Sequence, residues 1–142
     1  MIMNMSKNCK LIKVKDGQTT GTSTITTDTI DTQGFECVAI FGTIATVNAG
    51  NYAKARQGAA SNMSDGADLA GTKIVPGTNG NSFLIDLHRP TKRYVDVQVV
   101  RAGATTILGD IYALLCCPRK LPVTQGSTID AELHVSPEEG TA

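Results

Sequence analysis

The chain has little of several residue types, and each shortage excludes a class of protein. It has no tryptophan among 142 residues, and its aromatic and charged contents are only 4% and 18%. With 13 basic and 13 acidic residues, the formal net charge is zero, so bulk electrostatics do not favour binding to nucleic acid. No apolar run reaches the roughly 18 residues of a membrane-spanning helix, so we expect no membrane contact.

The chain also begins without the hydrophobic core of a signal peptide, which favours a cytosolic location. Its four cysteines match no zinc-binding spacing, and we expect free thiols that pack as small hydrophobic groups. Cys116 and Cys117 are neighbours in an apolar run, so a strand would point them to opposite faces. A bridge between Cys9 and Cys37 is left open, although a cytosolic chain disfavours it.

Glycine and threonine are abundant, and alternating apolar residues predict β-structure. The clearest strand is 93–101, where Val95, Val97 and Val99 would lie on one face. A short connection containing glycine leads to the apolar run 107–117, and this arrangement predicts a β-hairpin. The opposite face of the first strand would carry polar groups, which are Tyr94, Asp96 and Gln98.

Six further segments have the composition or alternation of strands. They are 10–15, 19–27, 35–47, 52–57 (with a helix as the local alternative), 82–88 and 129–135. About eight strands with Gly and Asn turns predict an all-β fold, namely an antiparallel β-sandwich, a jelly-roll-like fold or a small barrel. We expect one domain over 10–135, between an N-terminal arm (1–9) and a flexible C-terminal tail (136–142).

Region 58–81 predicts a long surface loop, and it contains a group of candidate metal ligands. An EF-hand would need a Glu about six residues after its glycine, but Thr72 follows Gly66 at that distance. We therefore expect no metal site there. The ligands considered were Asn62, Ser64, Asp65 and Asp68.

Other candidate sites are equally weak. Asp31-Thr32 followed by Gly34 is similar to the Asp-Thr-Gly of aspartic proteases, but the glycine comes one position late. His88 and His134 lie far apart, and no carboxylates are convincingly paired, so we expect no catalytic residue and no cofactor. One basic cluster predicts either a solvated turn or an anchor for an acidic surface; it comprises His88, Arg89, Lys92 and Arg93.

Several motifs together resemble a group of small bacteriophage head proteins. They are Asp31-Thr32-Gln33-Gly34-Phe35-Glu36, Tyr52 to Gln57 before Ser64-Asp65-Gly66, Lys92-Arg93-Tyr94-Val95-Asp96-Val97, and an apolar strand that ends at Pro118-Arg119 with Pro122-Val123. The resemblance covers roughly residues 20–123. The chain departs from the group after Gly66, where the usual aromatic residue is missing.

This resemblance implies a non-enzymatic capsid decoration, or cement, protein. Such a protein would bind the major capsid protein on the outer surface of the virion as a homotrimer, after assembly in the host cytoplasm. The chain ends 1–9 and 136–142 would then be free to reach a neighbour or the shell. The alternative is a jelly-roll fibre or a carbohydrate- or surface-binding module of a virion, although the chain offers few aromatic residues to stack on sugars.

Overall fold

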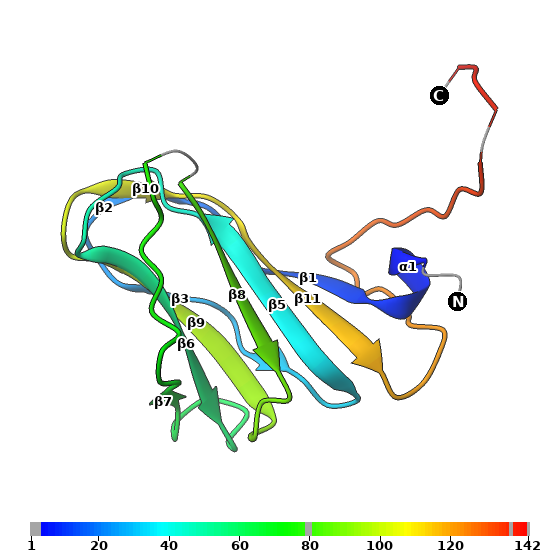
Figure 1. Ribbon diagram of the computed structural model, residues 1–142, viewed down its shortest axis with the longest axis horizontal. Coiled ribbons are helices and arrows are strands. Elements are labelled where there is room, and N and C mark those ends of the chain that lie inside the picture. Colours follow the sequence, from blue (N-terminus) through cyan, green and yellow to red (C-terminus); the bar gives the residue numbers. More distant parts are fainter. Residues whose placement is uncertain (1–3, 79–80, 137, 142) are drawn as a thin grey trace.

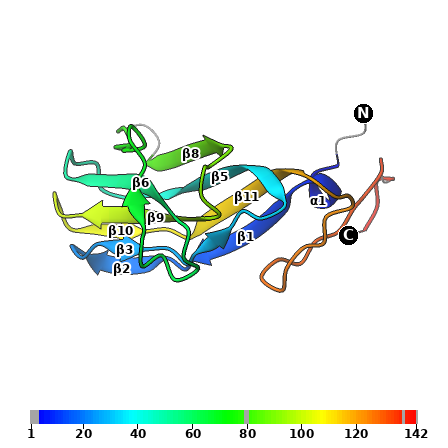
Figure 2. The same cartoon turned by 90° about the horizontal axis from the view of Figure 1, so that it is seen from below.

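Two antiparallel sheets lie face to face in the computed structural model, which describes residues 4–78, 81–136 and 138–141 (Figures 1 and 2). Sheet I has the order β1 (Lys10–Lys15), β11 (Ile111–Pro118), β5 (Phe35–Thr43) and β8 (Ser82–His88). Sheet II has the order β3 (Ile25–Thr26), β9 (Tyr94–Arg101), β6 (Asn51–Gly58) and β7 (Ala67–Asp68), and β4 (Ile30–Asp31) also pairs with β9. A small ladder joins β2 (Gln18–Gly21) to β10 (Thr106–Leu108) at one end.

The strand order is that of a jelly roll. If β2, β4 and β10 are left aside, the remaining strands run as first, eighth, third and sixth in sheet I, and as second, seventh, fourth and fifth in sheet II. This wrapping of eight antiparallel strands into two sheets is the jelly-roll arrangement. The all-β prediction is therefore confirmed in its sandwich, jelly-roll-like form, while the small barrel is not observed.

The hairpin predicted between 93–101 and 107–117 is wrong. β9 pairs with β6, β3 and β4 in sheet II, whereas β11 pairs with β1 and β5 in sheet I. The connection after β9 therefore crosses from one sheet to the other through β10. Local sequence could not reveal this, because a short loop containing glycine serves a hairpin and a crossing equally well.

The faces of the strands follow the predicted alternation. Val95, Val97 and Val99 are fully buried in β9, and Val38 and Ile40 are fully buried in β5. Together with Ala53, Ile85, Ala113 and Leu115 from the neighbouring strands, they form one core between the sheets. β-branched side chains suit this environment because they fit a pleated, half-buried surface with few rotamers to lose.

Two predicted segments differ from the observed structure, and a third settles an open alternative. Segment 19–27 is split between β2 and β3, and segment 129–135 forms no strand. The alternating residues of segment 129–135 pair with no other strand of the described chain, and Leu133 and Val135 remain 48% and 84% exposed. The strand at 52–57 is confirmed as β6, so its helical alternative is wrong.

Both chain ends fall partly outside the described residues. α1 (Met5–Asn8), a single helical turn, lies within the predicted arm 1–9, whose residues 1–3 are not described. The loop 58–81 is a surface segment with a short strand, β7, and its residues 79–80 are not described. Of the predicted tail 136–142, residues 137 and 142 lie outside the described part. Over the described residues, no helix is long and apolar enough to cross a membrane.

A buried arginine secures the corner where β9 ends. Arg101 is 3% exposed, and its guanidinium donates hydrogen bonds to the backbone oxygens of Thr19, Ser23 and Thr106 at 2.9 to 3.1 Å. A charged group so deeply buried is tolerated only when its donors are satisfied. This contact ties the end of sheet II to the small β2–β10 ladder.

Candidate functional site: the outer face of sheet I

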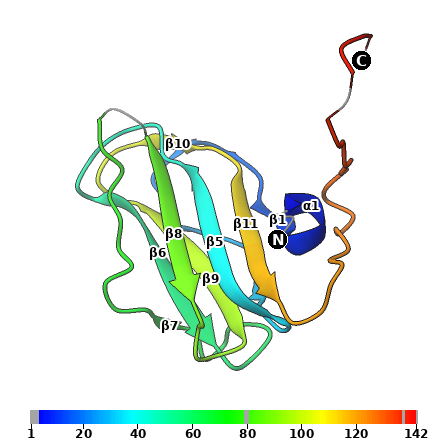
Figure 3. The ribbon, with the colours of Figure 1, turned by 45° about the vertical axis from the view of Figure 1, so that its right-hand side comes forward.

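Figure 3 shows the strands β8, β5 and β11 of sheet I in front of sheet II, and the side chains on their outer side are half apolar. Its side chains form cross-strand rows, because residues in register on neighbouring strands share a face. One row runs Leu84, Phe41, Tyr112, Lys13, and the next runs Asp86, Ala39, Leu114, Leu11. A third row contains His88, Cys37 and Cys116. We call these three rows the outer face of sheet I.

The first row carries the largest apolar side chains. The rings of Phe41 and Tyr112 stack with centroids 6.1 Å apart, and Lys13 Nζ lies 6.0 Å from the Tyr112 centroid. Leu84 at the end of this row is 58% exposed. Exposed leucines occur singly on many proteins, but this one lies in register with Phe41, whose ring stacks on Tyr112.

A groove of about 240 Å³ continues this face beyond β1. Its walls come from α1, β1, β11 and the chain after β11; they include Met5, Leu11, Leu114, Ile129 and Ala131. Gln125 holds the chain after β11 against α1 and the start of β1, since its side-chain amide donates to the backbone oxygens of Ser6 and Cys9 at 2.9 and 2.7 Å. Its Oε1 also accepts from Leu11 N at 3.0 Å. In Figure 1 the chain then leaves the sandwich beside α1 and runs outward toward the C-terminus.

The cysteines gather at the end of the outer face where β11 finishes. Cys9 and Cys116 form a disulfide, so the expectation of four free thiols is wrong. Cys37 Sγ lies 3.5 Å from Cys117 Sγ and 3.1 Å from His88 Nδ1. Cys116 and Cys117 do not present their sulfurs to opposite faces, because Cys117 has a φ of 54° that breaks the strand alternation.

Burial first, and then the hydrogen bond to Cys117, raise the pKa of the Cys37 thiol. Desolvation disfavours a charged thiolate, and a donated S–H bond favours the protonated form of its donor. Cys37 is therefore a thiol at neutral pH, and it donates to Cys117.

The predicted basic cluster finds its acidic partners within the chain. Arg89 pairs with Glu36 at 3.0 Å and Arg93 pairs with Asp31 at 2.7 Å. Lys92 lies 3.7 Å from an oxygen of Asp65. The solvated turn is thus the better of the two interpretations, although His88, the fourth member, instead contacts Cys37.

The candidate metal ligands of the long loop have hydrogen-bond or ion-pair partners within the chain. Asp65 accepts hydrogen bonds from Ala59 N at 2.8 Å and Ala60 N at 3.0 Å, and these bonds hold the pKa of its carboxyl below the usual range. Asn62 Oδ1 accepts from Ser64 N at 3.0 Å, and Asp68 pairs with Lys54 at 2.6 Å. Across the ranges described, no three His, Cys, Asp or Glu side chains meet in a geometry that could hold a metal ion.

The other sequence candidates are also separate in space or occupied. His134 pairs with Glu132 at 3.0 Å in the segment after β11, away from His88 on β8. Thr32 Oγ1 donates to Arg93 O at 2.7 Å, and Asp31 Oδ1 accepts from Gln33 N, so the Asp-Thr pair shapes a turn. Gly34 completes this turn with a φ of 86°, a backbone conformation that glycine adopts readily.

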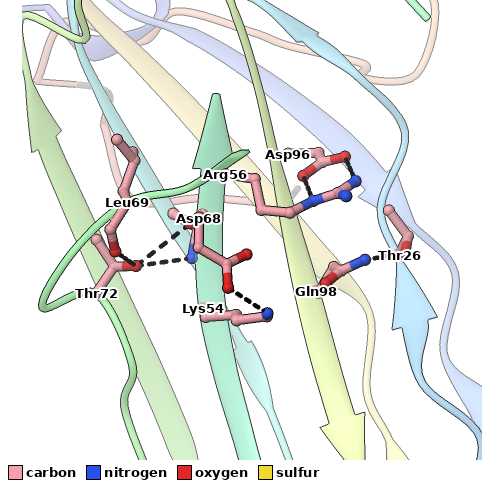
Figure 4. A network of polar contacts seen from close by, with 9 residues as sticks. Thr26, Lys54, Arg56, Asp68, Leu69, Thr72, Asp96 and Gln98 are labelled. Atoms are coloured by element: carbon pink, nitrogen blue, oxygen red, sulfur yellow. Dashed lines mark hydrogen bonds and ion pairs between the residues drawn. The ribbon is translucent and has the colours of Figure 1, made fainter. Parts of the chain in front are cut away.

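The outer face of sheet II has a different character, which Figure 4 shows in detail. Arg56 and Asp96 form a two-pronged ion pair at 2.9 and 2.5 Å, and Lys54 pairs with Asp68 beside it. Asp96 lies on the polar face that the alternation predicted, but it is only 2% exposed because Arg56 from β6 covers it. The polar groups of this face are engaged with one another, which leaves the outer face of sheet I as the more apolar of the two.

Sequence reasoning missed two features of this site. The first is the Cys9–Cys116 pair, which depends on β1 lying beside β11 at opposite ends of the chain. Apolar strands that begin or end in Cys were the available signal, but their pairing was not evident. The second is Gln125, whose role depends entirely on tertiary contacts.

Comparison with known proteins bears on the fold. No family model matches the chain, and no curated protein matches its sequence. A solved structure, that of the SPBc2 prophage-derived protein YomS, is similar with a TM-score of 0.50 and 11% sequence identity. The likeness covers 82% of this chain and 100% of that one. At this identity the similarity concerns the fold alone.

Proposed function

We propose that this chain is a non-enzymatic structural protein of a bacteriophage particle, which binds the outer surface of the capsid and stabilises it. The observation that carries the proposal is a jelly roll with one half-apolar sheet face and one face of mutually paired charges. Jelly rolls are common in viral shells, although a fold alone does not fix a function. The solved structure of similar fold is described as prophage-derived, which agrees with a phage origin.

The outer face of sheet I is the surface we assign to the capsid. Protein interfaces have apolar, aromatic centres and polar rims, and charged residues are depleted at the centre. Phe41, Tyr112 and Leu84 would form such a centre, with Lys13 and Asp86 at its margins. The major capsid protein is the partner we propose.

A homotrimer is the assembly we propose on the shell. Three linked copies would engage equivalent capsid sites together, so weak individual contacts would sum through effective concentration. The chain after β11 supports contact between copies or with the shell, because Leu121, Leu133 and Val135 are exposed on it. The N-terminal residues are less suited to reach a neighbour, since the Cys9–Cys116 disulfide attaches their end to β11.

The test is saturable binding to capsids purified without this protein. The full chain should pellet with such capsids to a fixed stoichiometry and raise their resistance to heat. Leu84→Asp should abolish pelleting, whereas Ile107→Asp should not, because Ile107 is similarly exposed at 52% but lies on β10. Equal binding by both variants, or no binding by the wild type, would reject the assignment.

A second candidate is a carbohydrate-binding module of the virion. It is favoured by the stacked, partly exposed rings of Phe41 and Tyr112, because sugars bind to aromatic faces. Glycan-array binding that is lost in Tyr112→Ala, without capsid binding by the wild type, would favour this candidate over the first.

A further inference from the structure

Three side chains from three strands of sheet I converge beside the Cys9–Cys116 disulfide. Cys37 lies opposite Cys116 on β11 and opposite His88 on β8, which places it at the centre of its row. Cys117 Sγ reaches Cys37 Sγ at 3.5 Å because its φ of 54° turns the chain out of the regular pleat. The two free cysteines of the chain therefore meet across a strand pair.

The distances leave little to change before a bond could form. A disulfide joins its sulfurs at roughly 2.05 Å, so the two would need to approach by about 1.5 Å. Rotation about the two Cα–Cβ bonds is the side-chain freedom by which the sulfurs can approach each other. Cys117 is exposed, so a soluble reagent can reach it, while Cys37 is partly covered.

We propose that Cys37 and Cys117 are a redox-active thiol pair, which small disulfides such as glutathione disulfide oxidise to a second intramolecular disulfide. The site is a place of covalent modification, and it is independent of the capsid-binding proposal above. Its components are the exposed thiol of Cys117, the covered thiol of Cys37 and the imidazole of His88.

The reaction proceeds in two exchange steps. First, the Cys117 thiolate attacks one sulfur of glutathione disulfide; a Cys117–glutathione bond forms, the glutathione S–S bond breaks and one glutathione thiolate leaves. The Cys37 S–H donates to Cys117 and stabilises this attacking thiolate. Second, Cys37 loses its proton to His88 Nδ1 and attacks the Cys117 sulfur, which releases the second glutathione. Two protein thiols are oxidised, and one glutathione disulfide is reduced to two thiols.

The two roles follow from the environments of the sulfurs. Burial and the hydrogen bond to Cys117 raise the pKa of Cys37, so it does not begin the exchange. His88 lies on the side of Cys37 that faces β8, at 3.1 Å, where the imidazole can accept the proton. Exchange rates depend on access to the attacking sulfur, and the exposure of Cys117 favours it as the first nucleophile.

The new bond would restrain the point at which the segment after β11 leaves sheet I. Cys117 is followed by Pro118 at the end of β11, and the chain then leaves the sheet. With Cys116 already joined to Cys9, a Cys37–Cys117 bond would fix the end of β11 to strands on both of its sides. Oxidation would thus restrict where the segment after β11 departs.

The test is to treat the full chain, with Cys9–Cys116 formed, with glutathione disulfide and to follow the products by intact mass and peptide mapping. The wild type should lose both free thiols and two hydrogen atoms, with Cys37 linked to Cys117. Cys37→Ser should stop at one glutathione on Cys117, and Cys117→Ser should react at least about tenfold more slowly. Free thiols that persist, or a bond to Cys9 or Cys116 instead, would overturn the proposal.

The histidine's role has a separate readout. His88→Gln should accumulate the Cys117–glutathione intermediate, because the second step lacks its proton acceptor, while the first step keeps its rate. His134→Gln is the matched control, since His134 contacts only Glu132 in the described part of the chain. If His88→Gln and His134→Gln pass through the intermediate equally fast, His88 has no part in the exchange.

Discussion

Arg93 donates two hydrogen bonds to Asp31, at 2.8 and 2.7 Å, across the edge of sheet II. Asp31 belongs to the motif that opens at the end of β4, and Arg93 belongs to the motif that begins β9. Thr32 N and Oγ1 both donate to Arg93 O, so the two motifs form one structural unit. These two motifs therefore meet at one corner of the fold, where their side chains and backbone bond to each other.

This pair predicts a loss of stability in acid. The hydrogen bond from Arg93 holds the pKa of Asp31 below its usual range, so the stabilisation is present above the unfolded pKa of about 3.9 and is lost as the pH falls through the folded value. Asp31→Asn should flatten the decline in unfolding free energy below about pH 5. Urea denaturation at a series of pH values measures this, and an unchanged slope would contradict it. The effect should be small, because both side chains are 46% exposed.

The covered pair Arg56–Asp96 should matter more than the exposed pair next to it. Asp96→Ala would leave the Arg56 guanidinium, which is 19% exposed, without its partner, and should cost about 3 kcal/mol. The matched control is Asp68→Ala, which frees Lys54 at a site where the Asp is 56% exposed and should cost less than about 1 kcal/mol. Chemical denaturation of both variants gives the comparison. Equal losses would mean that Asp96 is not effectively buried.

Substitution by Asp should cost much more stability at Val97 than at the adjacent Gln98 on β9. Val97 is fully buried, so Val97→Asp would place an unpaired carboxylate in the core and cost about 3 kcal/mol or more. Gln98→Asp should be mild, because Gln98 lies on the outer face of sheet II and faces Lys54 on β6. Thermal melting distinguishes the two, and similar melting temperatures would show that the strand faces are misassigned.

The Cys9–Cys116 disulfide should contribute strongly to stability. The bond closes a loop with a sequence separation of 107 residues, for which chain-entropy arguments give about 4–5 kcal/mol as an upper value. The double variant Cys9→Ser with Cys116→Ser should lower the unfolding free energy by about 2–5 kcal/mol. Cys37→Ser is the control and should cost about 1 kcal/mol or less. Titration of the unfolded, unreduced protein should find two thiols, whereas four would contradict the bond.

The two chain ends should differ in what their removal does. Deleting residues 132–142 removes exposed side chains such as Val135 and should leave the melting temperature unchanged while weakening capsid binding. Deleting residues 1–9 removes Cys9 and the Lys7 carbonyl that accepts from Val123 N, so the melting temperature should fall. Calorimetry and capsid pelleting measure both effects. A stable protein after the N-terminal deletion would argue against the anchoring role of these residues.

Local pattern predicted most strands, because alternation reports directly which side of a strand meets the core. Val95, Val97 and Val99 are the clearest case, and the turn at Gly34 follows from its freedom at positive φ. Pairing was beyond local pattern: β9 and β11 have the appearance of a hairpin, yet each completes a different sheet. The alternation at 129–135 predicted a strand as well, but in the described chain this segment pairs with no other strand.

The site was harder to predict than the fold, since each of its parts depends on residues distant in sequence. Cys9 meets Cys116, and Cys37 meets Cys117 and His88, only after β1, β5, β8 and β11 lie side by side. The burial of Asp96 was missed for a related reason. Strand alternation placed it correctly on the outer side of sheet II, but Arg56 from the neighbouring strand covers it there.

The place of β11 between β1 and β5 sets a condition on biosynthesis. Until the ribosome has released residues 111–118, the N-terminal strand has no neighbour in sheet I, and one edge of β5 has no partner. Pairings of such long sequence separation form slowly, and unpaired edges invite association with other chains. Sheet I can therefore be completed only after its last strand, β11, has left the ribosome, although the β5–β8 pair can form earlier.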